Sequence, residues 1–212
     1  MADDARWAGS EPRLVEAIRD EILGSPQGRI TFARFMERAM TEPGLGYYAT
    51  SDLRPTRAGD FLTAPELHPF FGRCLGRLVN AAWDASASSP FRVLEFGGGR
   101  GTLRADATDG LGFHVRWARA DLPGRSDDES APADLALANE YLDALPAHRV
   151  IQESGLLEAY VSWVVDWFSE VRGEPSTPEL AAHLAADEVE LQHGQRAEIC
   201  LAAPRWLSTV AA

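Results

Sequence analysis

The sequence predicts an α/β protein with a mainly parallel sheet, and three observations lead to that prediction. Helix-like and strand-like segments alternate through the middle of the 212-residue chain, as in folds whose helices connect parallel strands. A strand-like segment, residues 91–96, runs directly into a glycine-rich loop, residues 97–101. The apolar fraction of 45% and the charged fraction of 25% are those of an ordinary globular protein.

The first part of the chain is predicted to be helical. Apolar residues at helical spacing predict helices over residues 11–24 and 31–40. Residues 44–61 are rich in turn formers and predict a long loop. Thr63 and Glu66 have the spacing of a capping box, which predicts the start of a helix that continues to residue 85.

The remainder alternates between strand-like and helix-like patterns. The expected strands are residues 91–96, 113–121 and 134–139, three meander strands within 147–175, and 196–201; the expected helices are 102–111, 178–185 and 203–212. We therefore expect two domains: a helical N-terminal cap region, residues 1–88, and a core, residues 89–212, that carries the β-meander as an insertion at about 147–175.

Charge and composition exclude several classes of function. The net charge of −12 argues against a nucleic-acid partner, because such proteins need a basic surface. No apolar run approaches the about 20 residues of a membrane helix, and the first residues resemble no signal peptide, so we expect a cytoplasmic protein without a membrane partner. All 20 basic residues are arginine, which excludes lysine-dependent phosphate loops and suggests a GC-rich bacterial genome. The five histidines show no metal-ligand spacing.

The glycine loop is the strongest chemical signal. Gly97, Gly99 and Gly101 alternate, and Glu95 lies two residues ahead. Between a strand and a helix, this arrangement points backbone amides at a ligand. Dinucleotide sites require G-x-G-x-x-G, but Thr102 occupies the last position. The spacing is that of S-adenosylmethionine sites, whose cationic ligand suits a carboxylate. A tight turn that binds nothing is the alternative, and the loop by itself leaves both open.

Four motifs then occur in a fixed order along the chain: Gly46-Tyr47-Tyr48, Gly59 to Glu66 with Phe71-Gly72, Glu95 to Gly101, and Asn139 to Pro146. Together they resemble the MidA-type family of S-adenosylmethionine-dependent methyltransferases, whose mitochondrial members methylate arginine in a subunit of respiratory complex I. The resemblance implies a Rossmann-like class I methyltransferase fold with a helical N-terminal cap and a small β-meander insertion; the departures from the family pattern described below make us expect its sheet to be incomplete. It also implies S-adenosylmethionine as cofactor and a protein substrate methylated on arginine. The net charge of −12 separately favours a basic partner.

The resemblance also implies roles for single residues. Asp60 and Thr63 would lie beside the cofactor, although they can equally brace a loop and cap a helix. Asn139 and Glu140 follow a strand that would end next to the glycine loop, where Glu140 can accept two hydrogen bonds from a guanidinium. They can also merely begin a helix. Asp143 would support that pocket or face solvent.

The chain departs from the family pattern in length. Only 37 residues separate Gly101 from Asn139, and because a single βαβ unit needs about 30 or more residues, one βα unit must be missing. Asp121 then has two interpretations. It can end the strand that carries the ribose-binding acid, or it can belong to the next strand and lie near the adenine or have no role; we favour the second.

The last strands of the family pattern are also missing from this sequence. We therefore expect an incomplete sheet whose open edge a second copy or a partner chain covers. The main alternative function is a non-catalytic module that acts in binding or complex assembly. A dinucleotide-dependent oxidoreductase is the third candidate function.

Overall fold

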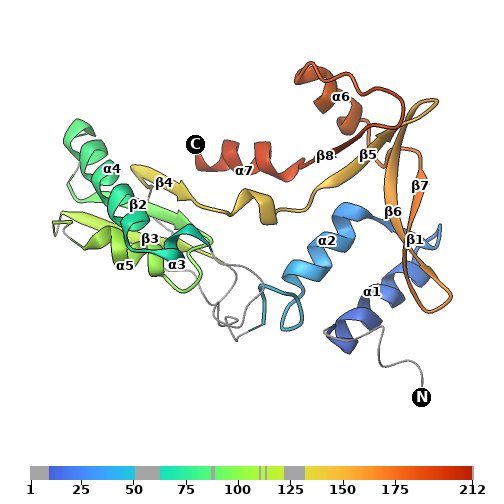
Figure 1. Cartoon of the computed structure of the whole chain (residues 1–212), viewed down its shortest axis with the longest axis horizontal. Coiled ribbons are helices and arrows are strands. Elements are labelled where there is room, and N and C mark those ends of the chain that lie inside the picture. Colours follow the sequence, from blue (N-terminus) through green and yellow to red (C-terminus); the bar gives the residue numbers. More distant parts are fainter. Residues whose placement is uncertain are drawn as a thin grey trace. The chain divides into compact units, whose positions relative to one another are not determined.

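A computed structural model describes residues 10–50, 63–86, 89–109, 111–112, 114–121 and 132–211. The chain divides into two compact units (Figure 1). Unit 1 combines Met1–Thr50 with Leu145–Ala212, and unit 2 is Ser51–Ala144. Asp60, one of the expected site residues, lies outside the described residues.

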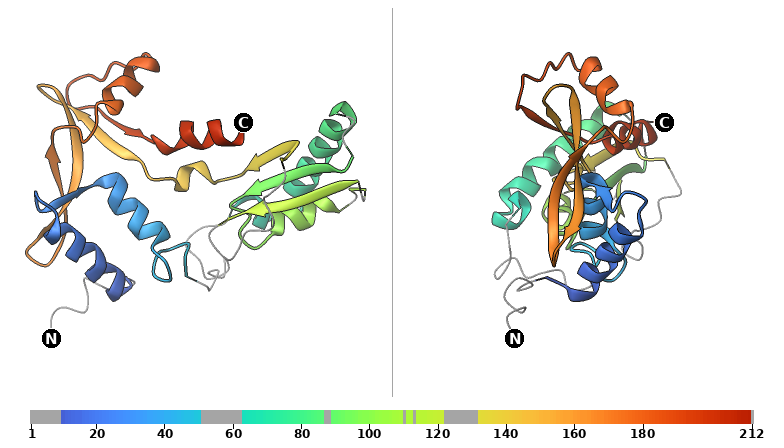
Figure 2. Two further views of the ribbon diagram at one scale, coloured as in Figure 1. Left: turned by 180° about the vertical axis from the view of Figure 1, so that it is seen from behind. Right: turned by 90° about the vertical axis from the view of Figure 1, so that its right-hand side faces the viewer.

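Unit 2 is built on a three-stranded parallel sheet with the order β3-β2-β4. The strands are β2 (Phe91–Phe96), β3 (Val115–Ala120) and β4 (Leu135–Ala138), and the helices are α3 (Ala64–Leu67), α4 (Phe70–Ser86), α5 (Thr102–Thr108) and the 3-10 turn η1 (Leu142–Ala144). Helices α4 and α5 lie on the same side of the sheet (Figure 2). The α/β class with a parallel sheet is therefore confirmed.

The core of unit 2 lies between this sheet and its two helices. Val79 of α4 and Ala107 of α5 pack against Phe91, Val93 and Trp117 of the strands. The helices approach closely because α4 carries glycine at the contact: a Cβ on Gly76 would lie 2.4 Å from the carbonyl oxygen of Ala107. Close helix packing thus depends on a missing side chain.

The helix predicted to run on from Thr63 is broken. Thr63 and Glu66 do form the capping box, but α3 ends after one turn and His68 is extended, with φ −164° and ψ 140°. Pro69 is the cause, because a residue before proline is driven out of the helical region. The helix restarts at Phe70, whose backbone N–H donates to His68 Nδ1 at 3.0 Å.

In its described residues, unit 1 is a five-stranded antiparallel sheet with four helices. Its strands are β1 (Arg29–Thr31), β5 (His148–Gln152), β6 (Leu156–Val164), β7 (Trp167–Gly173) and β8 (Arg196–Ile199), and its helices are α1 (Pro12–Gly24), α2 (Phe32–Thr41), α6 (Glu179–Ala186) and α7 (Ala202–Val210). The long strand β6 organises the sheet, since it pairs with β1, β5 and β7. No helix in the described ranges is long and apolar enough to cross a membrane.

This division of the chain differs from the expected boundary at residue 88. The meander was expected as an insertion in the core, residues 89–212, but it forms one unit with the N-terminal helices. The reason is a shared core, in which Ile18, Ile22 and Ile30 pack with Val161 of β6. Strand β1, which joins the two segments, has only three residues.

Unit 1 also contains a fully buried glutamate. Glu158 of β6 has a relative exposure of 0%. Its Oε1 lies 2.7 Å from His148 Nδ1, and its Oε2 accepts a hydrogen bond from the backbone N–H of Ser176. Burial alone raises the pKa of Glu158, but these hydrogen bonds outweigh it and hold the pKa below the ordinary value.

Candidate functional site

The residues that follow the three strands of unit 2 meet at one edge of its sheet. Phe96 of β2 is in register with Ala120 of β3 and with Ala138 of β4. Because the strands are parallel, the next residues along the chain, at positions 97, 121 and 139, all leave the sheet at its carboxyl edge. Open α/β sheets bind their ligands at this edge.

The glycine loop connects β2 to α5 in a conformation that favours glycine. Gly97, Gly99 and Gly101 have φ angles of 65°, 49° and 76°, in the left-handed region where other residues are strained. The loop is anchored at its start, where the N–H of Gly97 donates to the carbonyl of Ala120 at 2.9 Å. Among the described residues, a Cβ on Gly99 would meet nothing nearer than 3.9 Å, and one on Gly101 nothing within 4 Å. Within the described part of the chain, the second half of the loop therefore presents bare backbone.

Two side chains from neighbouring strands support the loop. Arg119 Nη1 donates to the carbonyl oxygen of Gly99 at 3.0 Å. A Cβ on Gly98 would lie 2.9 Å from Arg119 Cδ and 3.0 Å from Glu95 Cδ. The loop therefore rests directly on Arg119 and Glu95. The sequence did not single out Arg119, because its role depends on the pairing of β3 with β2.

Glu95 lies beneath the loop. Its relative exposure is 2%, and Oε2 accepts a hydrogen bond from Trp117 Nε1 at 2.8 Å. Burial raises the pKa of Glu95 above the ordinary value, an effect that Trp117, Arg104 and Arg119 oppose and Asp121 reinforces. The carboxylate of Glu95 is therefore held in place by Trp117, beneath the loop and away from solvent.

The segment after β4 contacts the glycine loop. A Cβ on Gly97 would lie 2.8 Å from Cδ2 of Tyr141, and the ring centroids of Tyr141 and Phe96 are 5.7 Å apart. Asn139 is half-buried and Glu140 is exposed. Glu140 has a φ of 48°, which costs a side-chain-bearing residue about 1–2 kcal/mol. Strain of this kind is concentrated at functional sites.

The remaining expected residues lie at different places in unit 2. Asp121 directly follows Ala120 and acts electrostatically on Glu95, which places it near the glycine loop. β3 pairs directly with β2, as the ribose-binding interpretation of Asp121 requires. Thr63 begins α3, which contacts both α4 and α5. Asp143 is exposed in η1.

Comparisons with known proteins agree with this arrangement. A family model described as "putative S-adenosyl-L-methionine-dependent methyltransferase" matches residues 107–212, half of the chain. Mitochondrial protein arginine methyltransferase NDUFAF7 of Mus musculus is 45% identical over 80 residues, which are 37% of this chain and 18% of that protein. The NDUFAF7 homolog of Drosophila melanogaster is 39% identical over 94 residues, or 44% of this chain and 21% of that protein.

A solved structure matches almost the whole chain. It is a protein from Burkholderia thailandensis bound to S-adenosyl-homocysteine, with 31% identity, a TM-score of 0.82, and coverage of 99% of this chain and 61% of the other. The chain thus spans about three fifths of that protein and, in the matched segments, about a fifth of the curated relatives. These matches confirm the MidA-type resemblance and the Rossmann-like methyltransferase fold, and the chain belongs to the family of S-adenosyl-L-methionine-dependent methyltransferases that the family model describes.

Proposed function

We propose that this chain binds S-adenosylmethionine over the glycine loop and transfers its methyl group to an arginine side chain of a protein. The observation that carries the proposal is the carboxyl edge of the parallel sheet, where the glycine loop, Asp121 and the Asn139–Glu140 pair meet. The ligand bound to the solved neighbour and the activity for which the NDUFAF7 relatives are named support the choice of cofactor and acceptor.

The glycine loop can accept a nucleoside cofactor because its glycines carry no side chains. Gly99 and Gly101 have positive φ and no side chain of the described residues packed on them, so a ligand can approach the main chain there without meeting a Cβ. For Asp121, at the end of β3, we adopt the ribose-binding interpretation in place of the one favoured from the sequence, because β3 pairs directly with β2. Glu95 and Arg119 hold the loop from beneath. When bound, the cofactor supplies an electrophilic methyl group attached to a sulfonium.

The acceptor side chain is assigned to Asn139 and Glu140. The carboxylate of Glu140 can accept two parallel hydrogen bonds from one guanidinium, which fixes the plane of the group. Methyl transfer is a displacement at carbon, so alignment of the attacking nitrogen supplies much of the rate. Asn139 adds a side-chain amide that can donate and accept beside the same nitrogen.

Cofactor binding is tested by thermal unfolding with S-adenosylmethionine and with S-adenosyl-homocysteine. Ligand at 100 times its Kd should add about 2.7 kcal/mol of stability. Gly99→Val places a branched side chain over the loop and should abolish the ligand-induced shift. Gly28→Val is the matched control, because Gly28 also has a positive φ of 62° and open space but belongs to unit 1. Equal ligand-induced shifts in both variants would contradict the site.

Catalysis is tested by labelled methyl transfer to an arginine-rich protein. Glu140→Gln keeps the shape of the side chain but removes its charge, and should lower turnover by about 100-fold through lost alignment while the cofactor-induced shift is retained. Glu188→Gln is the control, since Glu188 is also exposed and has a φ of 54°. An unchanged rate in Glu140→Gln would remove Glu140 from the mechanism.

One observation favours the alternative, a non-catalytic module for binding or assembly. The parallel sheet has three strands in the described part of the chain, as expected for a methyltransferase-type sheet that is incomplete. Absence of any ligand-induced shift at millimolar cofactor would favour this alternative.

We further propose a basic protein as the substrate, the bacterial cytoplasm as the location, and an assembly with a second copy or a partner chain. The net charge of −12 supports a basic substrate through electrostatic attraction. The exclusive use of arginine as the basic residue supports the bacterial origin. Size measurement by light scattering, with and without substrate, tests the assembly.

A further inference from the structure

Tyr141 joins the segment after β4 to the first glycine of the loop. A Cβ placed on Gly97 would lie 2.8 Å from Cδ2 of Tyr141 and 3.6 Å from both its Cβ and its Cγ. The ring therefore occupies the space that a side chain at position 97 would need. A Cβ on Gly99, in contrast, would have no described side chain within 4 Å outside its chain neighbours. The contact with Tyr141 is thus specific to the start of the loop.

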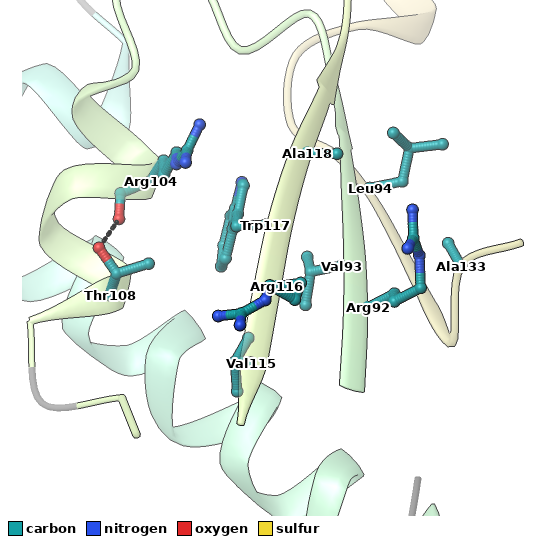
Figure 3. Close-up of a pocket in the computed structure, with 10 residues that line it drawn as sticks. All are labelled: Arg92, Val93, Leu94, Arg104, Thr108, Val115, Arg116, Trp117, Ala118 and Ala133. Carbon is teal, nitrogen blue, oxygen red and sulfur yellow. Dashed lines mark hydrogen bonds between the residues drawn. The ribbon is translucent and has the colours of Figure 1, made fainter. Parts of the chain in front are cut away.

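The loop is also supported from the helix-covered face of the sheet. Figure 3 shows Trp117 projecting from β3 toward α5, and Leu94 projecting from β2 to the other side. Glu95 hydrogen-bonds Trp117 and so shares its face. Because side chains alternate along a strand, Phe96 lies on the face of Leu94. The rings of Phe96 and Tyr141 are 5.7 Å apart at an interplanar angle of 48°, so Tyr141 adjoins Phe96 whereas Glu95 holds the loop from beneath.

The backbone around Tyr141 forms a defined turn. Glu140 has a left-handed φ of 48°, which turns the chain away from the direction of β4. The carbonyl of Tyr141 then accepts the N–H of Ala144 at 3.2 Å, across η1. Asn139 and Glu140, the proposed acceptor pair, directly precede Tyr141. Because packed atoms transmit displacement, a shift of the loop at Gly97 moves Tyr141 and with it this pair.

We propose that Tyr141 is a positioning residue for methyl transfer: its ring, packed on Gly97, sets the distance between the cofactor loop and the Asn139–Glu140 pair. The inference rests on the proposed function, which assigns the cofactor to the loop and the guanidinium to the pair. Displacement at carbon requires the attacking nitrogen in line with the breaking bond, and a misplacement of about 1 Å can lower the rate about 100-fold. A rigid ring between the two binding elements maintains that alignment.

Amide exchange tests this connection without relying on turnover. The N–H of Gly101, which donates to the carbonyl of Gly98 at 2.8 Å, reports the loop. The N–H of Ala144, which donates to the carbonyl of Tyr141, reports the segment. In the wild type, S-adenosyl-homocysteine at 100 times its Kd should slow exchange at both amides, by up to about 100-fold. In Tyr141→Ala it should slow exchange at Gly101 alone, and this retained protection shows that the variant is folded.

Turnover with the labelled cofactor and an arginine-rich protein separates positioning from binding. Tyr141→Ala should lower kcat about 30-fold and change the KM for the cofactor less than about threefold. Tyr141→Phe keeps the ring carbons that face Gly97 and should restore kcat to within about threefold of wild type. Leu142→Ala is the matched control, because Leu142 is the next residue along the chain and is 41% exposed; it should leave kcat unchanged.

A double-mutant cycle isolates the contact itself. Gly97→Ala presses a Cβ against the ring and also strains the backbone, which has a φ of 65° at this position. The backbone strain is the same with and without the ring, so it cancels in the cycle. Gly97→Ala should therefore lower kcat at least about fivefold more in the presence of Tyr141 than in the Tyr141→Ala background.

The outcomes distinguish this inference from the proposed function. Absence of protection at Gly101 or of turnover in the wild type contradicts the proposed function, and this inference with it. Equal protection of Ala144 in wild type and Tyr141→Ala, with Gly101 protected in both, overturns the role of Tyr141 alone. So do an unchanged kcat in Tyr141→Ala and independent effects in the cycle. Equal losses in Tyr141→Phe and Tyr141→Ala also overturn it, because the role would then belong to the hydroxyl group.

Discussion

The two units of the chain bury one glutamate each and stabilise them in different ways. Glu158, in the antiparallel sheet of unit 1, has a hydrogen-bond partner at each carboxylate oxygen. Glu95, beneath the glycine loop of unit 2, has the indole N–H of Trp117 on one oxygen. The pKa of Glu158 is lowered and that of Glu95 is raised. Burial is common to both residues, so the partners determine the direction.

The difference indicates what each unit is built for. In unit 1 the charged carboxylate is stabilised by the fold and in turn ties β5 and β6 to the segment that carries Ser176. In unit 2 the ionised form of the carboxylate is disfavoured, and the residue lies directly beneath the glycine loop. Groups with raised pKa values in such positions are typical of functional sites.

The largest effect is expected for Glu158→Ala. It removes the acceptor of His148 and of the Ser176 N–H inside a buried site and should destabilise unit 1 by about 3 kcal/mol or more. Urea unfolding, followed by hydrogen exchange in each unit, measures the loss. Glu198→Ala is the control, since Glu198 makes an ion pair with Arg149 on the same sheet at 60% side-chain exposure; its effect should stay below about 1 kcal/mol. Equal losses would show that burial does not distinguish the two carboxylates.

Replacing a helical glycine by alanine should have a smaller effect on stability, with opposite sign in the two units. Gly76→Ala forces a Cβ against the carbonyl of Ala107 at 2.4 Å and should cost unit 2 about 1–3 kcal/mol. Gly24→Ala, at the end of α1 with nothing within 4 Å, should instead stabilise unit 1 by about 0.4–1 kcal/mol. Thermal unfolding of both variants measures the contrast. Stabilisation by Gly76→Ala would refute the close contact between α4 and α5.

The smallest effect is expected for Glu95→Gln, which preserves an acceptor for Trp117. At pH 7 the free energy of unfolding should change by less than about 1 kcal/mol. Its pH dependence is more informative. Because the folded pKa of Glu95 is raised, its contribution to stability is complete below the ordinary value of 4.5 and is lost as pH rises through the folded value. The variant should therefore gain stability relative to wild type as pH rises.

Glu158→Gln should show the opposite slope. The lowered pKa of Glu158 contributes stability above 4.5 that is lost as pH falls through the folded value. Unfolding between pH 3 and pH 8, an interval spanning the ordinary carboxyl values of about 4, compares the two variants. Parallel slopes would contradict the distinction between the units.

Local patterns predicted most elements. The strand expected at 91–96 is β2 without change, and the glycine loop follows it as expected. The meander strands and the helices of both termini also agree within a few residues. These features depend on periodicity and turn residues, which act over short distances.

Long-range pairing accounts for what the sequence did not reveal. β1 has only three residues and is a strand because it pairs with β6, about 130 positions later. Arg119 became part of the candidate site only once β3 was placed beside β2. Pairing also determines the position of Glu95, which the sequence placed two residues ahead of the loop as a carboxylate suited to a cationic ligand. The residue is buried beneath the loop, because its side chain hydrogen-bonds Trp117 of the neighbouring strand.

The pairing of β1 with β6 also has a consequence for synthesis on the ribosome. Residues 51–144 emerge as a complete unit before β6 exists. At about 5–20 residues per second, β6 is synthesised roughly ten seconds after β1. During that delay β1 and the apolar faces of α1 and α2 lack the strand against which they pack. The nascent N-terminal helices therefore lack the strand that completes their core while the inserted unit folds.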